Sequence, residues 1–440
     1  MIIDARGGVA GEIAQRAAPS PGTGEGRAPS KASIAAAAAA IDRARKDWSR
    51  SVRAISSISR GGRSLGSRDR RAANDLAWHV VRGRRLLLAL LGSEDGTASS
   101  SDLVRAAAVL FADAPAASAP RHGRDGLEDP KHALLSRVLQ RGASPQAALG
   151  MATSLPDWFA AELLGQHDAA EACVIARGLL GRAPLTLRVH HDRTDRKTIL
   201  AELAEAGVDA SASPLAPFAI DLSGRVNVNA LAVVQRGEAS VQDAGSQRIA
   251  GLLAPQLGEK ILDACAGAGG KTLAMASLAP RARIIGCDVR PPALARAAKR
   301  ARLAQLSDRL RFLAIPSSGQ LPPALGVFAP VDAVLVDAPC TGSGSLRREP
   351  HARWSRPPTE IDRLPAVQAS ILDRFAPLVR PGGRLVYATC SLFVRENQDV
   401  VRDFLGRNQG FTLSEEEPLQ SRPDRDGCDG FFAAVLLRSA

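Results

Sequence analysis

Two of the six cysteines of this 440-residue chain stand at the ends of apolar runs. Cys340 lies in VDAPCTGSG, from Val336 to Gly344, and Cys390 lies in LVYATCS, from Leu385 to Ser391. A cysteine thiolate is a strong nucleophile that adds to electron-poor carbon atoms. Two thiols at the ends of neighbouring strands of one sheet would therefore form a reactive pair.

A glycine-rich stretch, LDACAGAGGKT from Leu262 to Thr272, precedes both cysteines. Its glycines let the backbone approach a ligand closely, and the helix predicted after it supplies free N–H groups. The stretch does not fit the P-loop, which requires a glycine at the position of Cys265. It also fails the G-x-G-x-x-G pattern, because Thr272 stands where the last glycine belongs. A ligand loop and a tight structural turn both remain open.

Asp288 strengthens the ligand interpretation, because it ends the next apolar run, 21 residues after Gly267. A carboxylate in this place can accept hydrogen bonds from both ribose hydroxyls of an adenosine group. The alternative is an N-cap for the helix predicted to start near Pro291. An adenosine-bearing cofactor without a diphosphate motif favours S-adenosylmethionine over NAD.

The residues around Cys340 indicate the target atom. Methyltransferases that act on exocyclic amines place an Asn or Asp, two prolines and an aromatic residue at this strand end. Here the order is Asp337, Ala338, Pro339, Cys340. A thiol in place of the aromatic residue favours a carbon target such as C5 of cytosine, which becomes nucleophilic once a thiolate adds at C6. Asp337 would hold the base edge. The C5 proton must later be removed before the thiol can leave, which is a reason for a second cysteine.

These motifs resemble, in order and spacing, those of the Sun/Fmu family of RNA cytosine-5 methyltransferases. The matching stretches are VQDAGSQ, LDACAGAGGKT, GCDVR, LVDAPCTGSGSLRREP, VYATCS and DGFFAAVL. The resemblance extends from about Ser154 to the C-terminus. It implies that Cys390 attacks the base, that Cys340 helps to release the product and that Asp337 contacts the base.

The resemblance also implies a site for S-adenosylmethionine. Its residues would be Cys265, Ala266, Gly267, Ala268, Gly269, Gly270, Lys271, Asp288, Ser318 and Asp337. Family members usually carry an aspartate that contacts the adenine where this chain has Ser318. A serine would make a weaker contact, so we expect looser cofactor binding.

The elements that must position these residues follow from the apolar pattern. Near-continuous apolar runs that alternate with helix-like segments predict an α/β fold with a mostly parallel sheet, the Rossmann-like class I methyltransferase fold. The predicted domains are a disordered tail (1–33), a helical and possibly RNA-binding region (34–111), a linker (112–150), a small α+β, RNA-binding-like module (151–240) and the methyltransferase domain (241–440).

The net charge of +12 favours a polyanionic partner, because Lys and Arg that neutralise phosphates release bound counterions. Coding bias is the alternative, since only seven of the 57 basic residues are Lys. The cysteines lack metal-ligand spacing, and we recognise neither a signal peptide nor a membrane span. We therefore expect a cytoplasmic monomer without metal.

The combined prediction is a methyltransferase that modifies C5 of a cytosine in structured RNA through a covalent bond between cysteine and C6. Ribosomal RNA is the favoured substrate. The alternatives are a tRNA cytosine-5 methyltransferase and an RNA-binding assembly factor with weakened catalysis.

Overall fold

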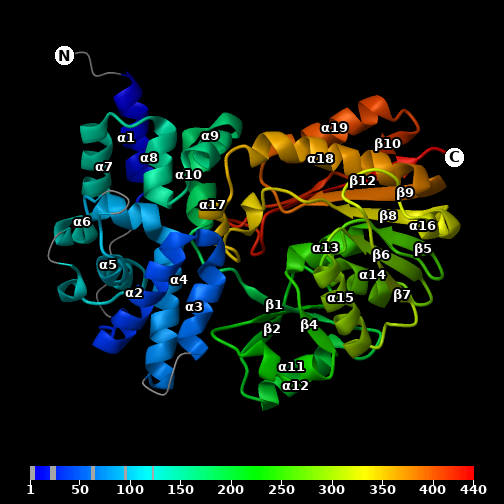
Figure 1. The fold of residues 1–440 in the computed structure, drawn as a ribbon, viewed down its shortest axis with the longest axis horizontal. Coiled ribbons are helices and arrows are strands. Elements are labelled where there is room, and N and C mark those ends of the chain that lie inside the picture. The colour runs from blue at the N-terminus through cyan, green and yellow to red at the C-terminus, as the bar shows by residue number, and fades with distance from the viewer. Residues whose placement is uncertain (1–4, 20–25, 61–64, 94–96, 121–122) are drawn as a thin grey trace. The chain divides into compact units, whose positions relative to one another are not determined.

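The structure is a computed structural model that describes residues 5–19, 26–60, 65–93, 97–120 and 123–440 (Figure 1). The chain divides into two compact units. The first, the helical unit, comprises Met1–Arg182 and Leu346–Pro358. The second, the sheet unit, comprises Ala183–Ser345 and Thr359–Ala440.

The helical unit is built from α-helices (Figure 1), and the buried faces of these helices carry Ala, Val, Leu and Ile. Its main helices are α1 (Ala5–Ala17), α2 (Lys31–Lys46), α3 (Ser51–Arg60), α4 (Ser67–Leu90), α5 (Ser100–Phe111), α6 (Arg124–Glu128), α7 (Pro130–Arg141), α8 (Pro145–Thr153), α9 (Asp157–Gln166) and α10 (Ala169–Gly178). In α4, Leu76, Val80 and Leu87 are buried at helical spacing, which is the pattern of one face packed on a core. The stretch predicted as helical, 34–111, contains α3 to α5 and all but the first three residues of α2.

The prediction of a disordered tail over 1–33 is wrong where the structure describes the chain from Ala5 to Ala17. These residues form α1, whose Ala10, Ile13 and Ala14 are fully buried. Small residues at helical spacing let helices pack closely, although their composition resembles that of a flexible segment. Residues 1–4 and 20–25 of the predicted tail lie outside the described residues.

The prediction of a linker over 112–150 is also wrong, because α6, α7 and the start of α8 occupy it. Pro130 and Pro145 are the first residues of α7 and α8, where a helix needs no N–H donor. Asp129 and Ser144 cap these helices by accepting hydrogen bonds from backbone N–H groups. The prolines that suggested a linker therefore start helices.

Residues 346–358 return to the helical unit immediately after the segment that carries Cys340. Within them, α17 (Ala352–Ser355) carries Arg353, whose side chain is 1% exposed. Its guanidinium donates hydrogen bonds to the backbone carbonyl oxygens of Arg82 (2.8 Å), Ser154 (3.4 Å) and Leu179 (3.1 Å). This short segment is thus an internal part of the helical unit.

The sheet unit begins with a small antiparallel sheet of order β2-β3-β1-β4. Its elements are β1 (Leu185–Val189), α11 (Arg196–Glu205), β2 (Ala210–Ala212), β3 (Ala219–Leu222) and β4 (Ala239–Val241). Buried Leu187 and Val189 of β1 pack against Ile199 and Leu203 of α11. The predicted α+β module over 151–240 contains this small sheet and α11, and its first helices, α9 and α10, pack within the helical unit.

The larger sheet has eight strands, with the order β10-β12-β9-β8-β5-β6-β7 and β11 paired to β12 (Figure 1). The strands are β5 (Lys260–Asp263), β6 (Arg283–Asp288), β7 (Leu310–Ala314), β8 (Val331–Asp337), β9 (Val379–Thr389), β10 (Phe411–Leu413), β11 (Leu419–Ser421) and β12 (Phe431–Arg438). The five strands from β5 to β9 are parallel, and β10, β11 and β12 pair antiparallel. This arrangement confirms the predicted Rossmann-like fold with a mostly parallel sheet.

The strand order of the larger sheet reverses between β5 and β8. Strands β6 and β7 follow β5 in the chain and lie on one side of it in the sheet. Strands β8 and β9 come later in the chain and lie on the other side of β5. In open α/β sheets, ligands bind where the strand order reverses in this way. Asp263 and Asp337 end the two strands that flank this point.

Candidate active site

The structure brings Cys340 and Cys390 together. Strands β8 and β9 are parallel neighbours in which Asp337 is in register with Ala388, so the residues that follow them lie at one edge of the sheet. The two Sγ atoms are 3.4 Å apart, and both cysteines are free thiols. The predicted pairing of these strand ends is therefore present in the fold.

The two thiols have different affinities for a proton. The hydrogen bond between them raises the pKa of Cys340 well above that of a free cysteine, and burial raises it further. The same hydrogen bond lowers the pKa of Cys390. Burial and Asp337 oppose this decrease, whereas Lys271 and a hydrogen bond from Ser345 support it. The directions of these two pKa shifts favour the thiolate on Cys390 over the thiolate on Cys340.

Lys271 is directed to Asp337 and the thiols. Its Nζ lies 2.7 Å from Asp337 Oδ2, and the lysine is 9% exposed. Burial would lower the pKa of Lys271, but Asp337 and Cys390 outweigh it, so the pKa is raised and the side chain stays charged. A buried cation beside two anionic groups stabilises both of them.

A network of hydroxyl groups and one carboxylate supports the thiols, and sequence reasoning missed it. Glu396 is fully buried and accepts hydrogen bonds from Thr341 and Ser391, the residues that directly follow Cys340 and Cys390. The available signal was the hydroxyl residue after each cysteine, in the pairs Cys-Thr and Cys-Ser. The carboxylate itself gave no spacing signal, because its place is set by the turn after β9.

The glycines of the predicted cofactor loop have two different roles. Gly267 has a φ of 54°, and a Cβ built on it would find only the Arg290 guanidinium, at 3.8 Å, within 4 Å. Gly269 has a φ of 80°, but its Cβ would lie 2.8 Å from the Cβ of Ala297 in α15 (Pro291–Leu303). Gly267 therefore leaves room for a ligand, whereas Gly269 is required for packing.

Asp288 at the end of β6 fixes this loop from the other side. Its Oδ2 accepts a hydrogen bond from the backbone N of Gly267 at 2.8 Å, and its Oδ1 accepts one from the N of Arg290 at 2.9 Å. Burial would raise the pKa of Asp288, but the hydrogen bonds from Arg290 and Gly267 outweigh it and lower the pKa. The alternative role as N-cap does not hold, because Arg290 occupies the N-cap position of α15.

The other predicted cofactor residues have varied surroundings. Cys265, Ala266 and Ala268 lie in the turn between β5 and α14 (Gly270–Leu278), and Gly270 begins that helix. Burial raises the pKa of Cys265 well above the ordinary value, so its thiol stays protonated. Ser318 is exposed in the loop after β7, and no side-chain hydrogen bond joins it to the other predicted residues, all of which the structure describes.

Asp263, at the end of β5, is a further buried carboxyl group beneath the loop. Burial raises its pKa to about 7, while a hydrogen bond from Thr272 Oγ1 to its Oδ2 at 2.6 Å opposes the increase. This bond joins the end of β5 to the first turn of α14 and so holds the loop between them in place.

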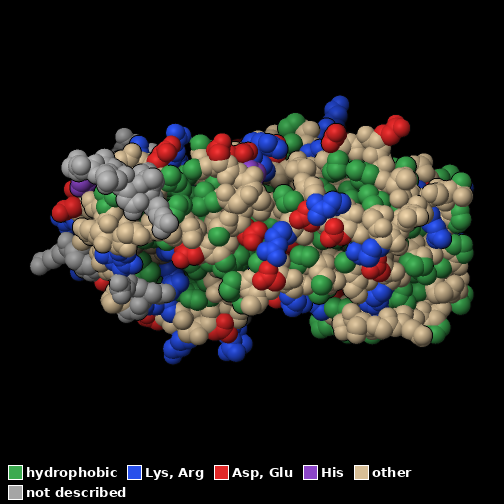
Figure 2. All heavy atoms as spheres, turned by 90° about the horizontal axis from the view of Figure 1, so that it is seen from above, with side chains coloured by type: hydrophobic (Ala, Val, Ile, Leu, Met, Phe, Trp, Pro, Cys, Tyr) green, Lys and Arg blue, Asp and Glu red, His purple; other side chains and the backbone are tan. Residues whose placement is uncertain are grey.

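The face of the molecule drawn in Figure 2 has Lys and Arg side chains interspersed with Asp and Glu, without a single continuous basic patch. Within the described ranges, no three His, Cys, Asp or Glu side chains are grouped to hold a metal ion. No helix of these ranges has both the length and the apolar character needed to cross a membrane.

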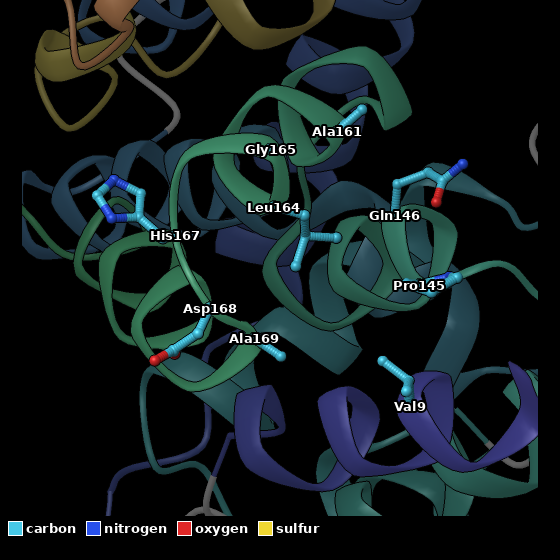
Figure 3. A pocket seen from close by; sticks show the side chains of 9 residues that line it. All are labelled: Val9, Pro145, Gln146, Ala161, Leu164, Gly165, His167, Asp168 and Ala169. Carbon is cyan, nitrogen blue, oxygen red and sulfur yellow. The ribbon is translucent and has the colours of Figure 1, made fainter. Parts of the chain in front are cut away.

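A cavity of about 460 Å³ lies in the helical unit, between residues of α1, α8, α9 and the turn into α10 (Figure 3). It is lined by Val9, Pro145, Gln146, Ala161, Leu164, Gly165, His167, Asp168 and Ala169. None of the predicted site residues lines it. The strand ends of the larger sheet therefore remain the candidate active site.

Two stretches of the chain match known RNA methyltransferases. Residues 250–437 match the family model described as 16S rRNA methyltransferase RsmB/F, and residues 155–229 match its ferredoxin-like domain. The ribosomal RNA small subunit methyltransferase B proteins of Salmonella paratyphi B and Salmonella heidelberg are each 37% identical over 267 residues. These matches cover 58% of this chain and 60% of each relative, so the chain spans about three fifths of their length.

Solved structures extend the likeness to the whole fold. The crystal structure of PH0851 has a TM-score of 0.74 at 22% identity and covers 94% of this chain and 100% of that chain. The structure of NSun6 from Pyrococcus horikoshii with SFG has a TM-score of 0.58 at 18% identity, covering 65% of this chain and 98% of that chain. At these identities the likeness concerns the fold alone. The sequence matches over residues 155–229 and 250–437 confirm the predicted resemblance to the RsmB/F, or Sun, family of RNA methyltransferases.

Proposed function

We propose that the protein methylates C5 of a cytosine in ribosomal RNA, with S-adenosylmethionine as the methyl donor. The observation that carries this proposal is the thiol pair, with Cys340 and Cys390 3.4 Å apart and the lower pKa on Cys390. The family match to rRNA methyltransferases supports the substrate class. The methyltransferase family and the SFG-containing neighbour support the cofactor.

In the proposed reaction, the Cys390 thiolate adds to C6 of the cytosine, and the electron pair displaced from the C5–C6 bond makes C5 nucleophilic. Asp337, held by Lys271, has an Oδ1 that accepts no hydrogen bond from the described residues. This oxygen can accept a hydrogen bond from the base edge. S-adenosylmethionine, when bound, supplies the methyl group to C5.

Product release then requires removal of the C5 proton. Before the reaction, the Cys390 thiolate accepts a hydrogen bond from Cys340 and so keeps the proton on Cys340. This anion is lost when Cys390 bonds to C6, and Cys340 can then release its proton to water. The Cys340 thiolate then takes the C5 proton, the bond between Cys390 and C6 breaks, and Cys390 leaves as a thiolate. The resting pair is restored, and one proton has passed to solvent for each methyl group transferred.

Bisulfite mapping of ribosomal and transfer RNA tests the function. RNA from cells that lack the protein should lose protection at one or a few rRNA cytosines, and expression of the intact chain should restore it. Protection lost only in tRNA would move the substrate to tRNA. Unchanged protection in both pools would refute the methylation proposal and favour an assembly factor.

Asp288→Ala should weaken S-adenosylmethionine binding by about 1 to 3 kcal/mol, because two ligand hydroxyls would lose a buried acceptor. Isothermal titration with the cofactor measures this loss. Arg290→Ala is the matched control, since it removes the partner of Asp288 and leaves the carboxylate itself. Equal affinity in wild type and Asp288→Ala would show that Asp288 supports only the loop.

A further inference from the structure

Glu396 is the most completely buried carboxylate near the thiols. It ends the short helix η6 (Val394–Glu396) and is 0% exposed. Its Oε1 accepts hydrogen bonds from the backbone N of Thr341 (2.8 Å) and Nε2 of Gln368 (3.1 Å). Its Oε2 accepts from the hydroxyls of Thr341 and Ser391, each at 2.5 Å. All four donors are neutral, so the negative charge is solvated by hydrogen bonds and not cancelled by an ion pair.

These bonds connect the two catalytic loops. Thr341 directly follows Cys340 and Ser391 directly follows Cys390, so one carboxylate holds the residues next to both thiols. Gln368 of α18 (Glu360–Phe375) adds a further link, because its Nε2 also donates to the carbonyl oxygen of Pro339 at 3.0 Å. Glu396 therefore helps to set the distance between the two Sγ atoms through its hydrogen bonds to Thr341 and Ser391.

The charge of Glu396 also acts on the thiols. It is one of the causes that raise the pKa of Cys340, whereas Lys271 is one of the causes that lower the pKa of Cys390. A buried anion beside one thiol and a buried cation beside the other both favour the thiolate on Cys390. The other titratable groups near the pair are Asp337, Tyr387 and Cys265, and burial raises the pKa of the last two, which keeps them neutral.

We propose that Glu396 is a positioning residue that sets the spacing of the two thiols and directs the negative charge of the pair to Cys390. This inference rests on the proposed function, because it assigns an order to the two thiols of that mechanism. Glu396 touches neither the base nor the cofactor in this role, and it acts through Thr341 and Ser391.

Alkylation by iodoacetamide without RNA or cofactor tests this assignment, with mass spectrometry to locate the modified cysteine. In the wild type, Cys390 should react at least about 10-fold faster than Cys340 at neutral pH, because the thiolate is the reacting form. In Glu396→Gln the charge is lost, so the two rates should approach each other, and methylation should fall about 100-fold. Retention of the wild-type preference for Cys390 in a folded Glu396→Gln variant would overturn the proposal.

Glu396→Asp separates charge from spacing. This variant keeps the charge, so Cys390 should still be alkylated first, but its shorter side chain cannot reach both hydroxyls, so turnover should fall about 10-fold. Wild-type turnover in Glu396→Asp would overturn the spacing role. This test does not depend on whether Glu396→Gln folds. Glu416→Gln, an exposed carboxylate, is the control and should change neither measurement.

The alkylation assay measures the reaction rates of the two thiols without RNA or cofactor, so its result is independent of the test of function. A wild-type protein that shows the predicted preference for Cys390 but protects no RNA cytosine would refute the methylation proposal alone. A wild-type protein that methylates RNA but shows no preference between the thiols would refute the role of Glu396 alone.

Discussion

Replacing Cys390 by alanine should abolish methylation, with a loss on the order of 10⁴-fold or more, because the proposed nucleophile is removed. No covalent species should form between this variant and RNA. Radiolabelled methyl transfer to RNA measures the first effect, and denaturing electrophoresis of protein with RNA and cofactor measures the second.

Replacing Cys340 by alanine should have a different result. Attack by Cys390 and methyl transfer remain possible, but the thiolate that takes the C5 proton is missing. A protein–RNA adduct should therefore accumulate and survive denaturation, while turnover becomes very slow. The 3.4 Å between the Sγ atoms places Cys340 beside the bond that must break.

The roles of the thiols would be reversed if Cys340 were the nucleophile, as in DNA cytosine methyltransferases. An adduct in Cys390→Ala would demonstrate that reversal. The absence of an adduct in Cys340→Ala, with RNA that the wild type methylates, would contradict the release role. Cys287→Ala is the control, because this buried thiol lies in β6, which β5 separates from β8.

Lys271→Met should raise the pKa of Cys390 and lower methylation roughly 10- to 100-fold at neutral pH. The lysine is a buried cation that favours the thiolate, and without it Asp337 would repel that thiolate unopposed. The alkylation rate of Cys390 should rise with pH in both proteins, because deprotonation creates the reactive form. The midpoint should lie below the free-cysteine value in the wild type and move to higher pH in Lys271→Met.

Lys260→Met is the matched control for this variant. Lys260 begins β5, at the opposite end of the strand from the active site, and its Nζ donates to the carbonyl oxygen of Phe328 at 3.1 Å. It should leave the alkylation profile of Cys390 unchanged. If Lys271→Met also retained the wild-type profile, the lysine would serve only to hold Asp337.

The sequence contained enough information to predict the strand ends of the larger sheet. Apolar runs such as that of β8 are buried on both faces, and the polar residues that follow them lie at the carboxyl edge, so Asp288, Asp337 and Cys390 stand at strand ends as the sequence predicts. Their register across β8 and β9 then decided which side chains meet.

The remaining features depend on contacts between distant residues. Lys271 was assigned to the cofactor loop, but its partner Asp337 is 66 residues away and no pattern in either stretch indicates the pair. Glu396 lies in a turn without hydrophobic periodicity. In the helical unit, the helices that begin at Pro130 and Pro145 have the composition of a linker. In the sequence, only the capping residue before each proline distinguishes these helices from a linker.

The return of residues 346–358 to the helical unit has a consequence for folding during protein synthesis. The first 182 residues leave the ribosome well before Leu346, and about 160 residues separate the two parts. At roughly 5 to 20 residues per second, this interval lasts on the order of 10 to 30 seconds. During that time the carbonyl groups of Arg82, Ser154 and Leu179 lack the guanidinium of Arg353. The part of the chain that is made first thus completes its core only after the loop that carries Cys340 has been synthesised.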